Sequence, residues 1–173
     1  MKGRMWRAVL GAGLGAVMSA APGCGKSEAL AGDGSRTAAE ADCPARVLTL
    51  DGQAQDWHHA LAYRAGGNTV IRIYNHDGVS CEDLLQDKIL RPPRDEQLIN
   101  IAMMSGDTYV TWAPDPSGGT RAKSRVVTKA DKAGDTLRVC LPEAVTLVGK
   151  GVHEGHTVVL QGLIEAHFCG DHP

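Results

Sequence analysis

The residues best suited to chemistry lie near the carboxyl end of the chain, in the run His153-Glu154-Gly155-His156. Zinc peptidases use the pattern H-E-x-x-H, in which two histidines four positions apart share one helical face and the glutamate acts as the base. Here the histidines are only three positions apart, and Gly155 lies among residues of strand character. The run therefore does not predict a peptidase.

A hairpin interpretation of the same run predicts a different metal site. If Glu154 and Gly155 form a two-residue turn, His153 and His156 are opposed on neighbouring strands, with Cβ atoms about 4.5–5.5 Å apart. Two such imidazoles, with Glu154 as a third ligand, could bind Zn²⁺ or Cu²⁺ weakly at the surface. A solvated turn that binds no cofactor is the favoured alternative.

Three other runs contain metal-binding residue types, and each has a simpler structural interpretation. Successive residues of a strand point to opposite faces, so in His58-His59 we expect His58 to be solvated and His59 partly buried. The run Asn75-His76-Asp77-Gly78 has the composition of a turn. Met103-Met104 ends an apolar strand, where packing in the core is the default. The chain has no G-x-S-x-G motif, and no catalytic residue is predicted.

The chain contains five cysteines, an odd number that cannot close entirely into internal disulfides. If Cys24 is set aside, an even set of four lies in the remainder, which permits three connectivities. These cysteines are Cys43, Cys81, Cys140 and Cys169. We favour Cys81–Cys169 with Cys43–Cys140, because these bonds would fix the two ends of the domain. A zinc site of four thiolates is disfavoured, since the chain has no C-x₂-C pair.

The first 23 residues have the pattern of a secretory signal peptide. Lys2, Arg4 and Arg7 give a positive start, and residues 8–21 are uncharged and mostly apolar or small. As a helix this stretch would span about 21 Å, which is less than the roughly 30 Å of a bilayer core. The sequence therefore predicts export, with residues 1–23 as a signal peptide.

The end of this leader, Ala21-Pro22-Gly23-Cys24, resembles the lipobox of bacterial lipoproteins, in which a cysteine after small residues receives a diacylglyceryl group. Gly23 and Cys24 fit that pattern, whereas the family usually has leucine at the position of Ala21, and Pro22 is unusual. The resemblance implies lipidation of Cys24 and a membrane-anchored lipoprotein of the bacterial cell envelope, at the outer membrane or the periplasmic face. A plain secreted or signal-anchored protein is the alternative.

Residues 24–42 predict a lipidated cysteine followed by a flexible tether. From Gly25 onward the segment consists mainly of Ala, Gly, Ser and charged residues, with Leu30 as its single large apolar side chain, so it cannot bury enough surface to fold. The run Gly25-Lys26-Ser27 also completes a loose nucleotide-binding pattern. We disfavour that interpretation, because the chain lacks the strand–helix alternation that a phosphate-binding loop requires.

Charge limits the partners of the remaining domain, residues 43–173. Thirteen basic side chains stand against sixteen acidic ones, which gives a net charge of −3. A mildly acidic domain has no attraction for nucleic acid or for anionic lipid. The expected partners are therefore the membrane, through the amino-terminal lipid, and another envelope protein.

Residues 43–173 predict an all-β domain, because short alternating or apolar runs recur between Gly, Asn, Asp and Pro. The expected strands are Ala45–Leu50, Trp57–Arg64, Thr69–Asn75, Gln97–Met104, Thr108–Ala113, Ser124–Thr128, Thr136–Leu141, Val145–Val148 and His156–Phe168. Gly66-Gly67 predicts a hairpin turn, since glycine reaches positive φ at little cost. Ser80, with Asp83 three positions later, predicts the start of a short helix closed by a capping box.

About nine strands with turns of the antiparallel type predict an antiparallel β-sandwich, Ig-like or similar, with a small closed barrel as the alternative. The run 162–169 also resembles the closing strand of small lipoprotein β-sandwich domains, in which a glycine opens the strand and a cysteine locks it. We therefore expect a non-enzymatic binding or structural module. A metal-binding protein is the first alternative, and an enzyme whose site is assembled from distant residues is the second.

Overall fold

The computed structural model describes residues 38–86, 97–113 and 119–172. They belong to one compact unit that runs from Ser35 to Pro173. Its strands are β1 (Val47–Leu50), β2 (Gln53–Ala54), β3 (His59–Ala65), β4 (Asn68–Tyr74), β5 (Leu98–Met104), β6 (Asp107–Ala113), β7 (Thr120–Ala122), β8 (Arg125–Thr128), β9 (Thr136–Val148) and β10 (Thr157–Asp171). Its helices are α1 (Ala38–Ala41), α2 (Cys81–Leu85) and the 3₁₀ turn η1 (Gly151–His153). Cys24, the predicted signal peptide and most of the predicted tether lie outside the described residues.

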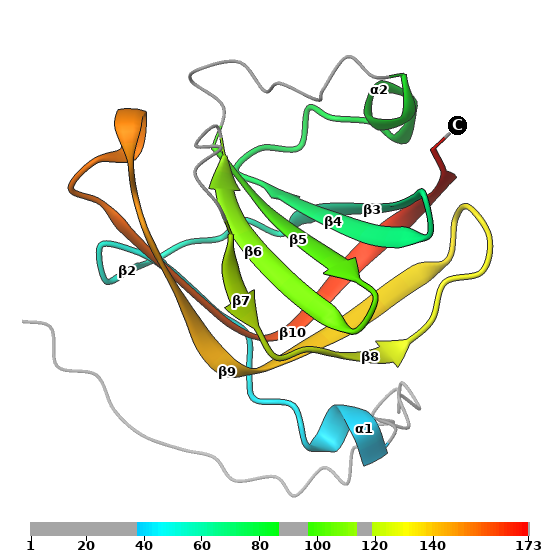
Figure 1. The fold of residues 1–173 in the computed structure, drawn as a ribbon, viewed down its shortest axis with the longest axis horizontal. Helices are drawn as coiled ribbons and strands as arrows, with labels where there is room; N and C mark the ends of the chain where they lie inside the picture. Colours follow the sequence, from blue (N-terminus) through cyan, green and yellow to red (C-terminus); the bar gives the residue numbers. More distant parts are fainter. Residues whose placement is uncertain (1–37, 87–96, 114–118, 173) are drawn as a thin grey trace, which may run out of the picture. The chain divides into compact units, whose positions relative to one another are not determined.

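All ten strands belong to one sheet, which curls into a half-barrel (Figure 1). The main order is β2-β1-β10-β3-β4-β5-β6-β7, and β9 pairs with β10 and with β8. Neighbouring strands are antiparallel except for β10 and β3, which run parallel with His167 opposite Leu61. The domain is therefore all-β, as the sequence predicted, but its sheet is mixed.

This architecture differs from the expected antiparallel β-sandwich, because the length of β10 joins what would otherwise be two sheets. Along one edge, the first part of β10 pairs with β1, from Val158 to Gln161, and its last part pairs with β3. Along the other edge, β9 pairs with β10 from Thr157 to His167. Because β10 pairs with β1, β3 and β9, the described strands form one continuous sheet rather than two separate layers.

Gly162 allows β10 to make this change of partner. The register of β10 against β9 shifts between Leu160 and Gly162, and Gly162 has a φ of +95°. A Cβ atom at this position would lie 2.4 Å from the carbonyl oxygen of Ala45, just before β1. Glycine is required here both for the backbone angle and for the close approach of the neighbouring chain.

The inner face of the curled sheet forms the main hydrophobic core. Its fully buried large side chains come from strands β4, β5, β6, β9 and β10. They include Ile71, Ile73, Ile99, Ile101, Val110, Val139, Leu141, Leu160, Ile164 and Phe168. A second, smaller cluster forms on the outer face around Leu61, Tyr74 and Leu98, where Leu84 of α2 covers it. Burial of both faces explains why the apolar runs in β4 and β5 are nearly continuous rather than alternating.

Local sequence signals agree well with the elements. Each of the nine expected strands overlaps an observed one, although Thr136–Leu141 and Val145–Val148 are parts of the single strand β9. The hairpin turn between β3 and β4 has Gly66 and Gly67 at positive φ, which confirms that prediction. Ser80 caps α2 with the predicted capping box, in which Ser80 Oγ accepts from the Asp83 N–H at 3.1 Å. Among the described residues, no helix has the length and apolarity to cross a membrane.

Candidate functional site

Two disulfides tie peripheral segments to the long strands. Cys43 bonds to Cys140 of β9, and Cys81 at the start of α2 bonds to Cys169 of β10. Of the three connectivities possible, this is the one that the sequence analysis favoured. The first bond fixes the chain just after α1, and the second fixes α2 over the outer hydrophobic cluster.

The turn predicted at Glu154-Gly155 is present, since the His156 N–H donates to the carbonyl of His153 at 3.0 Å, but it does not join two strands directly as the hairpin prediction required. β9 ends at Val148 and β10 begins at Thr157, so the connection is an eight-residue loop that contains η1. The loop is folded tightly, since the Gly149 N–H donates to the carbonyl of His156 at 2.8 Å. Consequently His153 and His156 are not an opposed pair on neighbouring strands.

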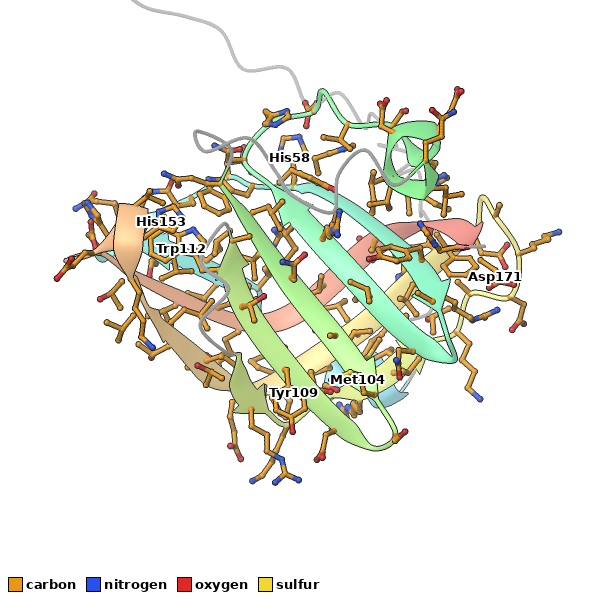
Figure 2. The ribbon with its side chains drawn as sticks, turned by 45° about the horizontal axis from the view of Figure 1, so that its top comes forward. His58, Met104, Tyr109, Trp112, His153 and Asp171 are labelled. Atoms are coloured by element: carbon orange, nitrogen blue, oxygen red, sulfur yellow. A yellow bond between two sulfur atoms is a disulfide. The ribbon has the colours of Figure 1, made fainter. Side chains whose placement is uncertain are left out.

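His153 points inward from this loop and packs on Trp112 of β6 (Figure 2). The two rings stack with centroids 4.0 Å apart and planes 6° from parallel. The Nε2 atom of His153 lies 3.0 Å from the carbonyl oxygen of Ala113, so Nε2–H donates to it. His153 is 5% exposed, and its position is that of a core residue.

His156 makes a separate contact on the surface. Its Nδ1 lies 2.6 Å from Oδ2 of Asp51, whose Oδ1 accepts from the Thr157 N–H at 2.8 Å. These hydrogen bonds, from His156 first and Thr157 second, lower the pKa of the Asp51 carboxyl. Glu154 is exposed. No group of three histidine, cysteine or carboxylate side chains suited to a metal ion occurs among the described residues, so the predicted site at His153, Glu154 and His156 is not assembled.

A groove of about 600 Å³ lies on the outer face of the sheet, between β3, the end of β10 and the segment that leads into α2. Its lining combines apolar and polar groups. The apolar part comes from Leu61, Val79 and Ala166, and the polar part includes three histidines, His58, His59 and His167, together with Glu165. Apolar grooves with a few convergent polar groups are the usual form of a small-molecule site.

The three imidazoles of this groove differ in their contacts. His59 is half-buried and its Nε2 lies 2.8 Å from the carbonyl oxygen of Val79, to which it donates. His58 is exposed, with its ring nitrogens 3.5 and 3.6 Å from carboxylate oxygens of Asp56 and Asp77. The imidazole of His167 is exposed and makes no hydrogen bond or ion pair within the described part of the chain. A ligand could therefore bind this ring without breaking a contact within the described residues.

Glu165 forms an ion pair with a guanidinium that it shares with Glu40. Its Oε1 forms an ion pair with Nε of Arg138 at 2.7 Å, and Nη1 of the same guanidinium donates to Oε1 of Glu40 at 2.5 Å. Arg46 also lies in the field of Glu165 and Asp56, although burial, the larger effect, lowers the pKa of its guanidinium. The Glu165 carboxylate is thus engaged by a cation on one side of the groove. The histidines are among the groove's remaining side chains that could form hydrogen bonds with a ligand.

The remaining sequence candidates have structural roles. His76 Nδ1 accepts from the Gly78 N–H at 3.0 Å, which closes the predicted turn. Met103 packs against the main core, and Met104 at the end of β5 is 38% exposed.

Comparison of the chain with known protein families, with curated proteins and with solved structures finds no match. The outer groove therefore has to be interpreted from its own chemistry.

Sequence reasoning did not single out Glu165 and His167 as members of a site. These two residues are two positions apart, so both side chains lie on one face of β10, and that signal was present in the sequence. Their neighbours could not be predicted, because β3 is more than a hundred residues away and pairs in parallel.

Proposed function

We propose that this protein is an exported, lipid-anchored module of the bacterial cell envelope, which binds a ligand without transforming it. The anchor would be the diacylglyceryl group on Cys24, and the residues between Cys24 and the start of the compact unit at Ser35 would hold the domain a short distance from the membrane. The lipobox-like run that ends at Cys24 and the signal-peptide pattern before it support this part of the proposal.

The two disulfides agree with export. Disulfides persist in oxidising compartments and are rare in the bacterial cytosol. Both bonds here join segments 88 or more residues apart, so each constrains a large part of the unfolded chain. They support an oxidising location without distinguishing one envelope compartment from another.

The observation that carries the binding role is the outer groove. It is open to solvent beside His58 and His167, has an apolar part in Leu61 and Val79, and is held in shape by the Cys81–Cys169 bond at its rim. Such a site fits a small organic molecule with an apolar body and a polar group that reaches an imidazole.

Intact mass of the protein from a bacterial host tests the anchor. We expect a mature chain that begins at Cys24, carries added acyl mass and sediments with membranes, whereas Cys24→Ser stays unlipidated. A wild-type chain processed elsewhere and released without acyl mass would contradict this part.

A nuclear magnetic resonance screen with a library of small aromatic and aliphatic carboxylates, amides and alcohols tests the groove. We expect bound fragments to shift the amides of Leu61, Val79 and Ala166. His167→Trp should fill the groove and abolish these shifts, while Lys132→Trp, on an exposed turn, should leave them unchanged. A library that shifts no groove amide, or shifts them equally in His167→Trp, would overturn the binding role.

A further inference from the structure

The disulfide Cys81–Cys169 opens onto the outer groove at one of its two ends. Cys81 is half-buried and is one of the residues that line the groove. Its partner Cys169 is only 5% exposed and belongs to the outer hydrophobic cluster. A molecule that enters the groove therefore meets this bond at Cys81.

The other disulfide, Cys43–Cys140, is enclosed by the sheet. Cys140 is fully buried within β9, where it pairs with Leu163 of β10 on one side and with Arg125 of β8 on the other. Neither cysteine of this bond lines the outer groove. The two disulfides thus form a matched pair, one reached through a groove and one covered by neighbouring strands.

The bond Cys81–Cys169 lies where strand pairing is interrupted. The pairing of β10 with β9 ends at His167, and the register of β10 against β3 shifts between Phe168 and Asp171. Helix α2, which begins at Cys81 and lies beside this end of β10, has only five residues (Figure 1). Peripheral segments of this kind open at a lower free-energy cost than the centre of a sheet. Breaking the bond would therefore release α2 and leave the strand ladders in place.

Thiol–disulfide exchange requires access to only one sulfur, because a thiolate attacks one sulfur of the bond and the other sulfur leaves. An incoming thiol that has given its proton to water would attack the Cys81 sulfur and form a mixed disulfide with it. The electron pair of the broken S–S bond goes to the Cys169 sulfur, which takes a proton from water. The burial of Cys169 does not hinder this step, since Cys169 is the leaving group.

A second thiol on the same partner completes the exchange. It attacks the partner's own sulfur in the mixed disulfide, and Cys81 leaves as a thiolate that is protonated in turn. The partner changes from a dithiol to a disulfide and loses two electrons and two protons. Cys81 and Cys169 gain them and become two thiols, so the reaction balances without a further reactant.

The groove favours a polypeptide as the source of the thiols. Its volume of about 600 Å³ has room for a cysteine together with the side chains next to it. Leu61, Val79 and Ala166 give it an apolar lining, which suits an apolar residue beside the attacking cysteine. The expected partner is an exported protein with two neighbouring cysteines on an exposed segment.

We infer that Cys81–Cys169 exchanges with dithiols of partner proteins and oxidises them, whereas Cys43–Cys140 serves the fold alone. This activity goes beyond the proposed binding of a small molecule. It requires that the groove admit a polypeptide thiol, and it does not require that a small molecule bind there.

Incubation of the native full chain with a reduced peptide tests this inference. The probe is a nine-residue peptide that has two cysteines separated by two residues and a leucine beside the first cysteine. We expect the peptide to become oxidised while alkylation and mass mapping find free thiols at Cys81 and Cys169. Reduction of Cys43–Cys140 should be slower by about tenfold or more.

Two tryptophan variants test the route to the sulfur. His167→Trp should fill the groove and slow reduction of Cys81–Cys169 by about tenfold, because the peptide can no longer reach the bond. Lys132→Trp, on an exposed turn outside the groove, should leave the rate unchanged.

Glutathione, which has a single thiol, identifies the sulfur that is attacked. We expect a mixed disulfide on Cys81 and a free thiol on Cys169. The inference is overturned if glutathione is found on Cys169, if both disulfides are reduced at the same rate, or if reduction occurs only in urea. A groove that supports exchange but binds no small fragment would uphold this inference and refute only the small-molecule role.

Discussion

His153 lies flat against Trp112, with ring centroids 4.0 Å apart, and its Nε2–H donates to the carbonyl of Ala113. The pair joins the loop after β9 to the end of β6, two elements about forty residues apart in the chain. A residue that the sequence offered as a metal ligand is thus a packing residue that holds the β9–β10 connection against the barrel.

Replacing His153 should therefore destabilise the fold. Stacked aromatic pairs contribute about 0.5–1.5 kcal/mol, and a buried hydrogen bond contributes a similar amount. We expect His153→Ala to lower the free energy of unfolding by about 2 kcal/mol in urea titrations followed by Trp fluorescence. His167→Ala, an exposed histidine, is the control and should change it by less than about 0.5 kcal/mol. Equal effects of the two substitutions would show that the stack contributes nothing.

Metal titration should show no site formed by His153, Glu154 and His156. One imidazole is buried against Trp112 and the other is bonded to Asp51, so binding a shared ion would require both contacts to break. In a competition titration with a zinc-sensitive dye, we expect His156→Ala to withdraw no less Zn²⁺ from the dye than the wild-type protein does. Stoichiometric uptake of Zn²⁺ or Cu²⁺ that disappears in His156→Ala would restore the metal hypothesis.

Local signals predicted the elements, because they depend on residues close together in sequence. The glycines at 66 and 67 specify a turn, and the capping box at Ser80 and Asp83 specifies a helix start. The disulfide pairing was also favoured correctly, since it followed from which segments lie at the two ends of the domain.

The arrangement of those strands could not be predicted, because strand pairing depends on contacts between distant residues. Nothing near His167 indicates that its neighbour is Leu61, or that the two strands run parallel. β2 and β7, of two and three residues, are too short for a periodic pattern to show. The outer groove depends on these pairings, so it could not be found from the sequence.

The change of partner along β10 should make Gly162 sensitive to substitution. Alanine there would have both an unfavourable φ and a Cβ atom 2.4 Å from a backbone oxygen. Gly134 is a matched control, because it has the same φ of +95° but no atom within 4 Å of an added Cβ. We expect Gly134→Ala to cost about 1 kcal/mol and Gly162→Ala at least about 2 kcal/mol more, measured by thermal unfolding. Equal costs would mean that the backbone near Ala45 moves aside freely.

The pair of Asp51 and His156 should add to the acid sensitivity of the fold. Hydrogen bonds from His156 and Thr157 lower the pKa of Asp51 in the folded state below its ordinary 3.8. A lowered pKa stabilises the folded protein above that ordinary value, and the stabilisation is lost as the pH falls through the lower folded-state value.

Asp51→Asn removes the charge but keeps an acceptor for Thr157, and asparagine tolerates the φ of +51° at this position. We expect the variant to be less stable at pH 6 and to lose less stability than wild type between about pH 5 and 2. Urea unfolding across this range measures both slopes, and parallel slopes would exclude a contribution from Asp51.

The two disulfides should be equivalent for stability but not for binding. They join residues 97 and 88 positions apart, so the restriction that each places on the unfolded chain is nearly the same. We expect Cys43→Ala with Cys140→Ala, and Cys81→Ala with Cys169→Ala, to lower the free energy of unfolding by a similar amount, about 2–4 kcal/mol.

The two bonds hold different segments, however. Loss of Cys81–Cys169 releases α2 and the Val79–Cys81 rim of the outer groove, whereas loss of Cys43–Cys140 releases the segment after α1, which Arg138 and Glu40 still connect to β9. Hydrogen exchange should therefore show that residues 79–85 lose protection only in the variant without Cys81–Cys169. Fragment binding in the groove should be lost in the same variant. Equal loss of groove binding in both variants would mean that the groove depends on overall stability rather than on the bond at its rim.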